Sequence, residues 1–153
     1  MMLVMSPASL PRVMGILNCT PDSFYAKSRR GSFESAWNAA RGMIREGVDI
    51  IDVGGESSRP GSRGIEPEEQ IKRTVPVIRA IREHTDIPVS IDTTSSKVAE
   101  AALDAGADII NDISAFQGDA DMCPLAAERQ VPIILMHMQG TPETMQKNPV
   151  YED

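Results

Sequence analysis

The sequence is poor in cysteine, in aromatic residues and in positive charge, and each shortage argues against a class of protein. Its two cysteines, Cys19 and Cys123, lie far apart and fit a reduced interior better than a disulfide framework. Lys and Arg number 15 against 22 Asp and Glu, which gives a net charge of −7. A nucleic acid or an anionic membrane surface needs a cationic footprint, so we expect neither as a partner. A small anionic ligand is compatible with this charge, because backbone N–H groups and a few Arg side chains hold an anion locally.

Long apolar runs are also missing. No run approaches the roughly 20 residues that a membrane-spanning helix needs. The first ten residues lack the basic start and long apolar stretch of a signal peptide, and they include Pro7. We therefore expect a cytoplasmic protein. The 153 residues suffice for one compact domain, and its core must consist mainly of Ile, Val, Ala and Met because aromatic residues make up only 4%.

Five short apolar runs predict β-strands. Each is nearly continuous in Ile, Val, Leu and Met and does not alternate with polar residues, which is typical of strands covered on both faces in a parallel sheet. The predicted strands are Val13 to Leu17, Asp49 to Val53, Pro88 to Ile91, Asp108 to Ile110 and Pro132 to Met136.

Helical patterns separate these strands. Apolar stripes with i, i+3, i+4 spacing predict helices around residues 33–44, 71–81 and 98–105, and we expect a short fourth helix around Met122. Gly47 and Gly106 are suited to end the first and third helices. Pro76 lies inside the second pattern, where we expect a kink or a frayed first turn.

The alternation of strands and helices predicts an α/β fold with right-handed crossovers. The sequence GVDIID at Gly47 to Asp52 is echoed by GADIIN at Gly106 to Asn111, which favours a repeated (β/α) unit as in a TIM barrel. A TIM barrel has eight strands and typically about 250 residues, whereas this chain supplies five strands. A five-stranded open sheet, as in flavodoxin-like folds, is the competing architecture.

Polar residues follow almost every predicted strand, at the edge where ligands bind in parallel α/β folds. Each also has a purely structural interpretation. Asp92 starts a sequence that can cap a helix, and Asn111 is a residue type that is common in turns. His137 fits a half-buried position, and His84 fits a solvated position on the surface. Their coincidence at one sheet edge favours binding instead. A carboxylate beside a carboxamide suits a planar heterocycle with alternating donors and acceptors, so the residues alone predict a site for a polar ring.

Five segments resemble the signatures of the dihydropteroate synthase family. The first two, MGILNCTPDSF (Met14 to Phe24) and DVGGESSRPG (Asp52 to Gly61), are long and specific. The others, VSIDT (Val89 to Thr93), INDIS (Ile110 to Ser114) and LMHMQGTPETMQ (Leu135 to Gln146), follow in the family's order and spacing. The resemblance implies a TIM (β/α)8 barrel. Residues 1–153 would form the N-terminal part of a single pterin-binding domain, with roughly its first five strands.

The resemblance also implies a reaction and the residues that perform it. Members of the family are transferases of folate biosynthesis and sulfonamide targets, and they form homodimers. With the help of Mg²⁺ they condense 6-hydroxymethyl-7,8-dihydropterin diphosphate with p-aminobenzoate and release diphosphate. The residues implied are Asn18 as the Mg²⁺ and diphosphate ligand, Ser58 (for the family's Thr) and Arg59 near p-aminobenzoate and diphosphate, Asp92 and Asn111 as the catalytic pterin-binding pair, and Ile113 and Met136 as walls of the pterin pocket.

The sequence departs from the family pattern in two respects. Residues 25–28 read Tyr-Ala-Lys-Ser where the family commonly has Ser-Asp-Gly-Gly, which removes an acidic contribution from the loop over the diphosphate. The family's later Asp, Lys, Arg and His site residues are not in this chain, so we expect the chain alone to be inactive. We also expect the open edges of the first and fifth strands to favour aggregation, or pairing with a second copy or a missing half. Two alternatives are a corrinoid-dependent methyltransferase barrel that binds pterin, and an inactive half barrel.

Overall fold

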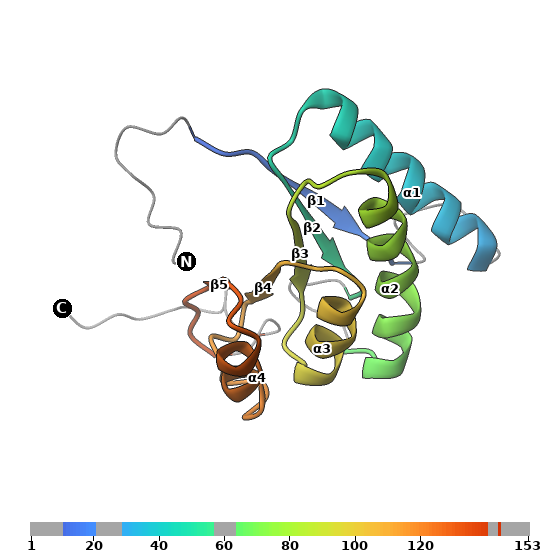
Figure 1. The fold of residues 1–153 in the computed structure, drawn as a ribbon. Coiled ribbons are helices and arrows are strands. Elements are labelled where there is room, and N and C mark those ends of the chain that lie inside the picture. The colour runs from blue at the N-terminus through green and yellow to red at the C-terminus, as the bar shows by residue number, and fades with distance from the viewer. Residues whose placement is uncertain (1–10, 21–28, 57–63, 141–143, 145–153) are drawn as a thin grey trace.

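The structure is a computed structural model that describes residues 11–20, 29–56, 64–140 and 144 (Figure 1). Strands and helices alternate through this part of the chain, as the apolar runs predict. The elements are β1 (Met14–Asn18), α1 (Arg29–Glu46), β2 (Ile50–Gly54), α2 (Pro67–His84), β3 (Val89–Asp92), α3 (Ser96–Asp104), β4 (Ile109–Asp112), α4 (Met122–Arg129) and β5 (Ile133–Leu135).

The first four strands start and end about one or two residues later than predicted, so each takes in the polar or glycine residue that follows its apolar run. The predicted helix ends hold: Gly47 and Gly106 follow α1 and α3 with φ of +82° and +107°, a conformation that glycine adopts without a Cβ clash. Helix α2 begins with Pro67 and runs as one helix through Pro76.

The five strands form one parallel sheet in the order β1-β2-β3-β4-β5. This order is that of consecutive (β/α) units in a TIM barrel, and it differs from the 2-1-3-4-5 order of flavodoxin-like folds. Helices α1, α2 and α3 line one side of the sheet (Figure 1), and each helix packs against the next. The predicted α/β fold class is therefore confirmed, and the flavodoxin-like alternative is wrong.

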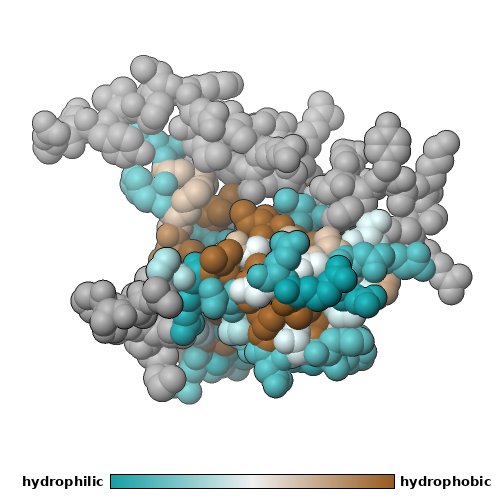
Figure 2. Space-filling model, turned by 90° about the horizontal axis from the view of Figure 1, so that it is seen from above, coloured by the Kyte–Doolittle hydropathy of each residue, from teal (hydrophilic) through white to brown (hydrophobic). Residues whose placement is uncertain are grey.

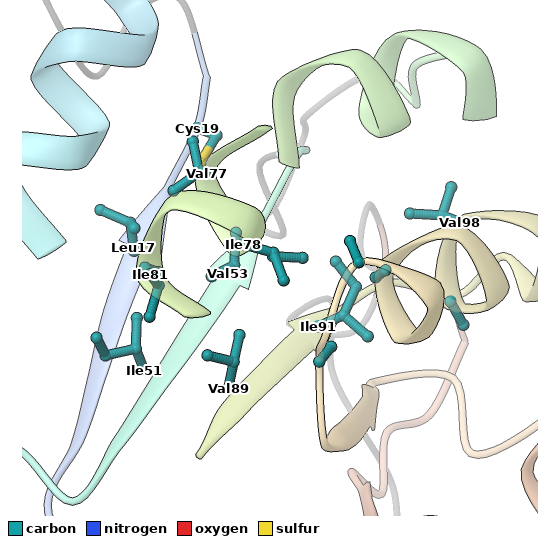
Figure 3. Packing of buried hydrophobic residues seen from close by; sticks show 14 of the residues in the cluster. Leu17, Cys19, Ile51, Val53, Val77, Ile78, Ile81, Val89, Ile91 and Val98 are labelled. Carbon is teal, nitrogen blue, oxygen red and sulfur yellow. The ribbon is translucent and has the colours of Figure 1, made fainter. Parts of the chain in front are cut away.

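The hydrophobic core lies between the sheet and its helices. Alternate strand residues point toward the helices, and those in the central row, Leu17, Val53, Ile91 and Ile110, are at most 1% exposed. They pack with fully buried residues of α2 and α3, among them Ile78 and Val98 (Figure 3). The core consists of Ile, Val, Leu, Ala and Met with one buried cysteine, as the scarcity of aromatic residues predicts.

Arg82 of α2 connects several segments at the end of the sheet where the strands begin. Its guanidinium donates to the carbonyl oxygens of Gly106, Thr85 and Ile87 and pairs with Asp108 at 2.7 Å. Asp108 in turn accepts a hydrogen bond from the N–H of Val89, the first residue of β3. These contacts join α2, β3 and the start of β4 on the side of the sheet away from the polar strand ends.

On the face of the sheet opposite the helices, apolar side chains of the outer strands are less buried than those of the core. Hydrophobic residues gather in the middle of the molecule when it is seen from above (Figure 2). Two large apolar side chains of the outer strands stay exposed on this face, Ile16 of β1 at 64% and Ile134 of β5 at 38%. No described helix combines the length and the apolar character that crossing a bilayer requires.

Candidate functional site

The structure places Asn18, Asp92 and Asn111 in one row across the carboxyl ends of four strands. In the sheet register Asn18 pairs with Gly54, Gly54 with Asp92, and Asp92 with Asn111. Partners in a parallel ladder point to the same face, so the three polar side chains share the face opposite the helices. The prediction that these residues meet at one sheet edge is confirmed.

Gly54 leaves an open space in the middle of this row. A Cβ at this position would lie 3.5 Å from Asp92 Oδ2 and 3.6 Å from Asn18 Oδ1. The two oxygens therefore border the same small space from opposite sides. Asn18, Gly54 and Asp92 thus form a floor with a side-chain oxygen on each side and no side chain in the middle, which leaves room for a ligand.

Negative charge is concentrated around Asp92. Burial raises the pKa of the Asp92 carboxyl to about 7, and the nearby charges of Asp52, Glu56 and Asp112 add to the shift. Among the described residues no side chain or backbone group donates a hydrogen bond to the Asp92 carboxylate that would lower its pKa again. A ligand with N–H groups or a cation would interact favourably with this carboxylate.

Asp52 is a member of the site that the sequence reasoning did not single out. It lies on β2 two residues before Gly54, on the same face of the sheet, and is only 4% exposed. Its Oδ2 accepts a hydrogen bond of 3.1 Å from Nδ2 of Asn111. Burial raises the pKa of the Asp52 carboxyl, and the Ser90 hydroxyl and the Asn111 amide offset part of that effect.

The stagger of the strands explains this contact. Asp52 and Asn111 hold equivalent positions in the echoed sequences GVDIID and GADIIN. In the sheet, however, Asn111 is level with Gly54, which is two residues past Asp52 and two strands away. This offset of one residue per strand is the stagger of an eight-stranded barrel with a shear of 8, in which alternate strands contribute to one interior layer.

Gln70 of α2 connects the segment after β2 to the end of β3. Its Nε2 donates to Glu56 Oε2 at 2.7 Å, and its Oε1 accepts from the Thr93 hydroxyl at 3.2 Å. Burial raises the pKa of the Glu56 carboxyl, and the positive charge of Arg73 opposes part of the shift. Gln70 sits in a helix outside the signature segments, so its role was not visible before the fold was known.

The loop after β4 is shaped by Asp112, which is fully buried. Its carboxylate accepts hydrogen bonds from the N–H and hydroxyl of Ser114 and from the N–H of Phe116. Ala115 and Phe116 have φ of 51° and 69°, a strained conformation for residues other than glycine. These bonds stabilise the loop that includes Ile113.

The remaining predicted residues fall into three groups. Ile113 and Met136 are half-buried in the segments that follow β4 and β5. Ser58 and Arg59 lie outside the described residues. His137 is exposed, and His84 is exposed with its ring 4.6 Å from that of Trp37, which fits the surface position predicted for His84.

The residues present fit a magnesium ion that is shared with a substrate. No cluster of three or more His, Cys, Asp or Glu within the described ranges could hold a metal alone. Mg²⁺ usually keeps several waters and takes only one or two protein oxygens together with substrate phosphates. The oxygens of Asn18 and Asp92 on either side of Gly54 provide such a donor set.

Comparison with known proteins relates the chain to one family. A family model described as pterin binding enzyme matches residues 14–153. The dihydropteroate synthase of Synechocystis sp. is 48% identical over 92% of this chain and 49% of that protein. A structure of the Xanthomonas albilineans dihydropteroate synthase with 4-aminobenzoic acid matches with a TM-score of 0.80 and 41% identity, over 84% of this chain and 48% of that one.

A second solved structure, the Yersinia pestis dihydropteroate synthase in a sulfonamide drug complex, matches with a TM-score of 0.82 and 41% identity. The match covers 94% of this chain and 51% of that one. The chain therefore spans about half the length of the relatives that it matches.

Proposed function

The chain belongs to the pterin-binding enzyme family, and from this premise we propose that it forms the pterin side of a dihydropteroate synthase active site. The substrates would be 6-hydroxymethyl-7,8-dihydropterin diphosphate and p-aminobenzoate. The bond between the pterin methylene carbon and the diphosphate oxygen breaks, and diphosphate leaves with the electron pair. The amine nitrogen of p-aminobenzoate bonds to that carbon and loses a proton, which gives 7,8-dihydropteroate.

The unsatisfied acidic site at Asp92 carries the proposal. A pterin ring presents N–H groups along its edge, and these would donate to the Asp92 carboxylate and the Asn111 carboxamide. When diphosphate departs, positive charge develops on the methylene carbon and spreads into the ring. The negative charges of Asp92 and its acidic neighbours would stabilise it.

The leaving group would lie toward Asn18, at the other end of the same row. Asn18 Oδ1 would hold a Mg²⁺ ion together with the Asp92 carboxylate on the other side of Gly54. The ion would neutralise charge that develops on the departing diphosphate. Gly54 keeps the floor between the two polar side chains clear, so the methylene carbon can lie between them.

The other residues would complete the site. Ser58 and Arg59 would bind near p-aminobenzoate and diphosphate, and Ile113 and Met136 would form walls of the pterin pocket. A sulfonamide would compete at the p-aminobenzoate position, as the drug complex of the Yersinia pestis relative supports. The free cysteines Cys19 and Cys123 favour a cytoplasmic location, and the protein would act as a homodimer.

The test is an activity assay on the intact gene product. Purified protein would be incubated with pterin diphosphate, p-aminobenzoate and Mg²⁺, and dihydropteroate would be followed by liquid chromatography. We expect turnover that requires all three and that falls by about 10² or more in Asp92→Asn, since a charge-stabilising group is lost. Asp108→Asn, a change at the far end of the sheet, should leave turnover unaffected.

The alternatives give different results in the same assay. An absence of dihydropteroate together with methyl transfer from a methylated pterin to a corrinoid partner would overturn the proposal in favour of the methyltransferase barrel. Pterin binding without turnover in the intact product would indicate an inactive half barrel.

A further inference from the structure

We propose that Asp52 is a positioning residue, which holds the Asn111 carboxamide with its oxygen turned toward the bound ring. The proposal rests on the proposed function, because it concerns how the pterin edge is recognised. Its basis is the 3.1 Å hydrogen bond from Asn111 Nδ2 to Asp52 Oδ2, which links strands that are not neighbours in the sheet.

The chemistry of the two groups determines the direction of this bond. An ionised carboxylate only accepts hydrogen bonds, so Asn111 must present its NH₂ group to Asp52. The carboxamide is planar, and its Oδ1 must then point away from Asp52. No described residue donates a hydrogen bond to that Oδ1, which leaves it free to accept from a ligand.

Asp52 lies where a carboxylate is costly to folding. It is 4% exposed, and burial raises its pKa. The Ser90 hydroxyl on the next strand lies close enough to lower that pKa, but the two groups do not form a hydrogen bond of good geometry, so Asp52 Oδ1 and Ser90 Oγ are both poorly satisfied. A buried polar atom without a partner destabilises a protein, and such atoms call for an explanation beyond packing. Orientation of Asn111 is a role that only an acceptor at this position could perform.

The consequence is a defined pattern of hydrogen-bonding groups. With Asn111 held by Asp52, the site presents two acceptors side by side, Asp92 and Oδ1 of Asn111, which are partners in the sheet register. This pair matches a ring edge that offers adjacent N–H donors. If the carboxamide turned over, it would present NH₂ beside the Asp92 carboxylate and match a different edge. Asp52 thus determines which edge of the ring the site selects.

The experiment compares Asp52→Asn with Asp52→Leu in the intact gene product. Both side chains have the branched shape and the number of non-hydrogen atoms of Asp and neither is charged, so the effect of the lost charge on Asp92 is the same in both. Only Asn keeps an acceptor for Asn111. The measured quantity is the dissociation constant for pterin itself, by isothermal titration calorimetry at pH 8.

We expect Asp52→Leu to weaken pterin binding about tenfold, the effect of one hydrogen bond lost to the ligand. Asp52→Asn should bind within about threefold of the parent. In an Asn111→Ala background the difference between the Leu and Asn variants should vanish, because no carboxamide is left to orient. Asp108→Asn serves as the control for a change in stability alone, and its pterin affinity should equal that of the parent.

Equal affinities of the Leu and Asn variants would overturn the inference, as would a difference that persists in the Asn111→Ala background. If Asp52→Leu does not fold, Asp52→Ala in the same comparison decides between these outcomes, because it too removes the acceptor. A parent protein that binds no pterin would instead refute the proposed function, so the two failures are distinguishable.

Discussion

Replacement of Asp92 by Asn should stabilise the protein while it removes function, and the gain should depend on pH. The carboxyl of Asp92 is buried, receives no hydrogen bond from a described residue and faces three other acidic groups, so its pKa is raised from 3.8 to about 7. The folded state therefore holds the proton more tightly than the unfolded chain does. Asparagine has the same shape and carries no charge at any pH, so the variant's free energy of unfolding does not depend on proton binding at this position.

The size of the effect follows from the two pKa values. Well below pH 3.8 the carboxyl is protonated in both states and does not affect stability. As the pH rises from about 4 to about 7 the unfolded chain loses the proton first, so stability falls through this window and levels off above the folded pKa. At about 1.4 kcal/mol per pKa unit the carboxylate costs about 2 kcal/mol at pH 5 and about 4 kcal/mol at pH 8.

Urea unfolding of the parent and of Asp92→Asn at pH 5 and pH 8 would measure this. The variant should be more stable at both pH values, and its advantage should grow by about 2 to 3 kcal/mol between them. Asp86→Asn, an exposed carboxylate in the loop before β3, is the matched control and should change stability by less than about 0.5 kcal/mol at either pH. If Asp92→Asn is no more stable than the parent at pH 8, or if the stability difference does not vary with pH, then the pKa of Asp92 is not raised in the folded protein.

Three further outcomes are expected. Gly54→Ala should fold normally, because its Cβ would make only ordinary contacts at 3.5 and 3.6 Å. Calorimetry in the presence of Mg²⁺ should nevertheless show weaker binding of pterin diphosphate, and an unchanged affinity would mean that no ligand crosses this floor. Gly55→Ala should lower the free energy of unfolding by about 1 to 3 kcal/mol, since its Cβ would lie 3.0 Å from the Thr74 side chain and 3.1 Å from the α2 backbone; a thermal melt like that of Gly54→Ala would contradict this. In thiol titration with a disulfide reagent, exposed Cys123 should react quickly and buried Cys19, whose pKa burial raises to about 12, should react only after unfolding; rapid reaction of two thiols in the native state would contradict it.

The positions of the strands and helices could be predicted from the sequence because local chemistry sets them. Continuous runs of Ile, Val and Leu are favourable only where both faces of a strand are covered, and Gly47 and Gly106 end their helices by their own backbone freedom. The strand limits were predicted about one residue early, since polar residues such as Asp92 and Asn111 looked like the start of loops. Their backbones still pair in the sheet, which a count of apolar residues does not detect.

The polar residues of the site divide in the same way. Asn18, Asp92 and Asn111 could be predicted, because each follows an apolar run and the carboxyl ends of parallel strands meet at one edge. Gln70 could not be, because its partners Glu56 and Thr93 lie 14 and 23 residues away and come together only when α2 packs on the sheet. The order of the strands, which distinguishes a barrel from an open sheet, also depends on the tertiary structure.

Asp52 shows most clearly what the sequence could not decide. The echo of GVDIID in GADIIN determined that Asp52 and Asn111 occupy equivalent places in their (β/α) units, and alternation along each strand determined the face on which each side chain lies. Whether two equivalent side chains touch depends on how far each strand slides relative to its neighbour. That slide is one residue per strand here, set by the tilt that strands need to wrap into a barrel, and it brings the Asp52 carboxylate to the Asn111 amide.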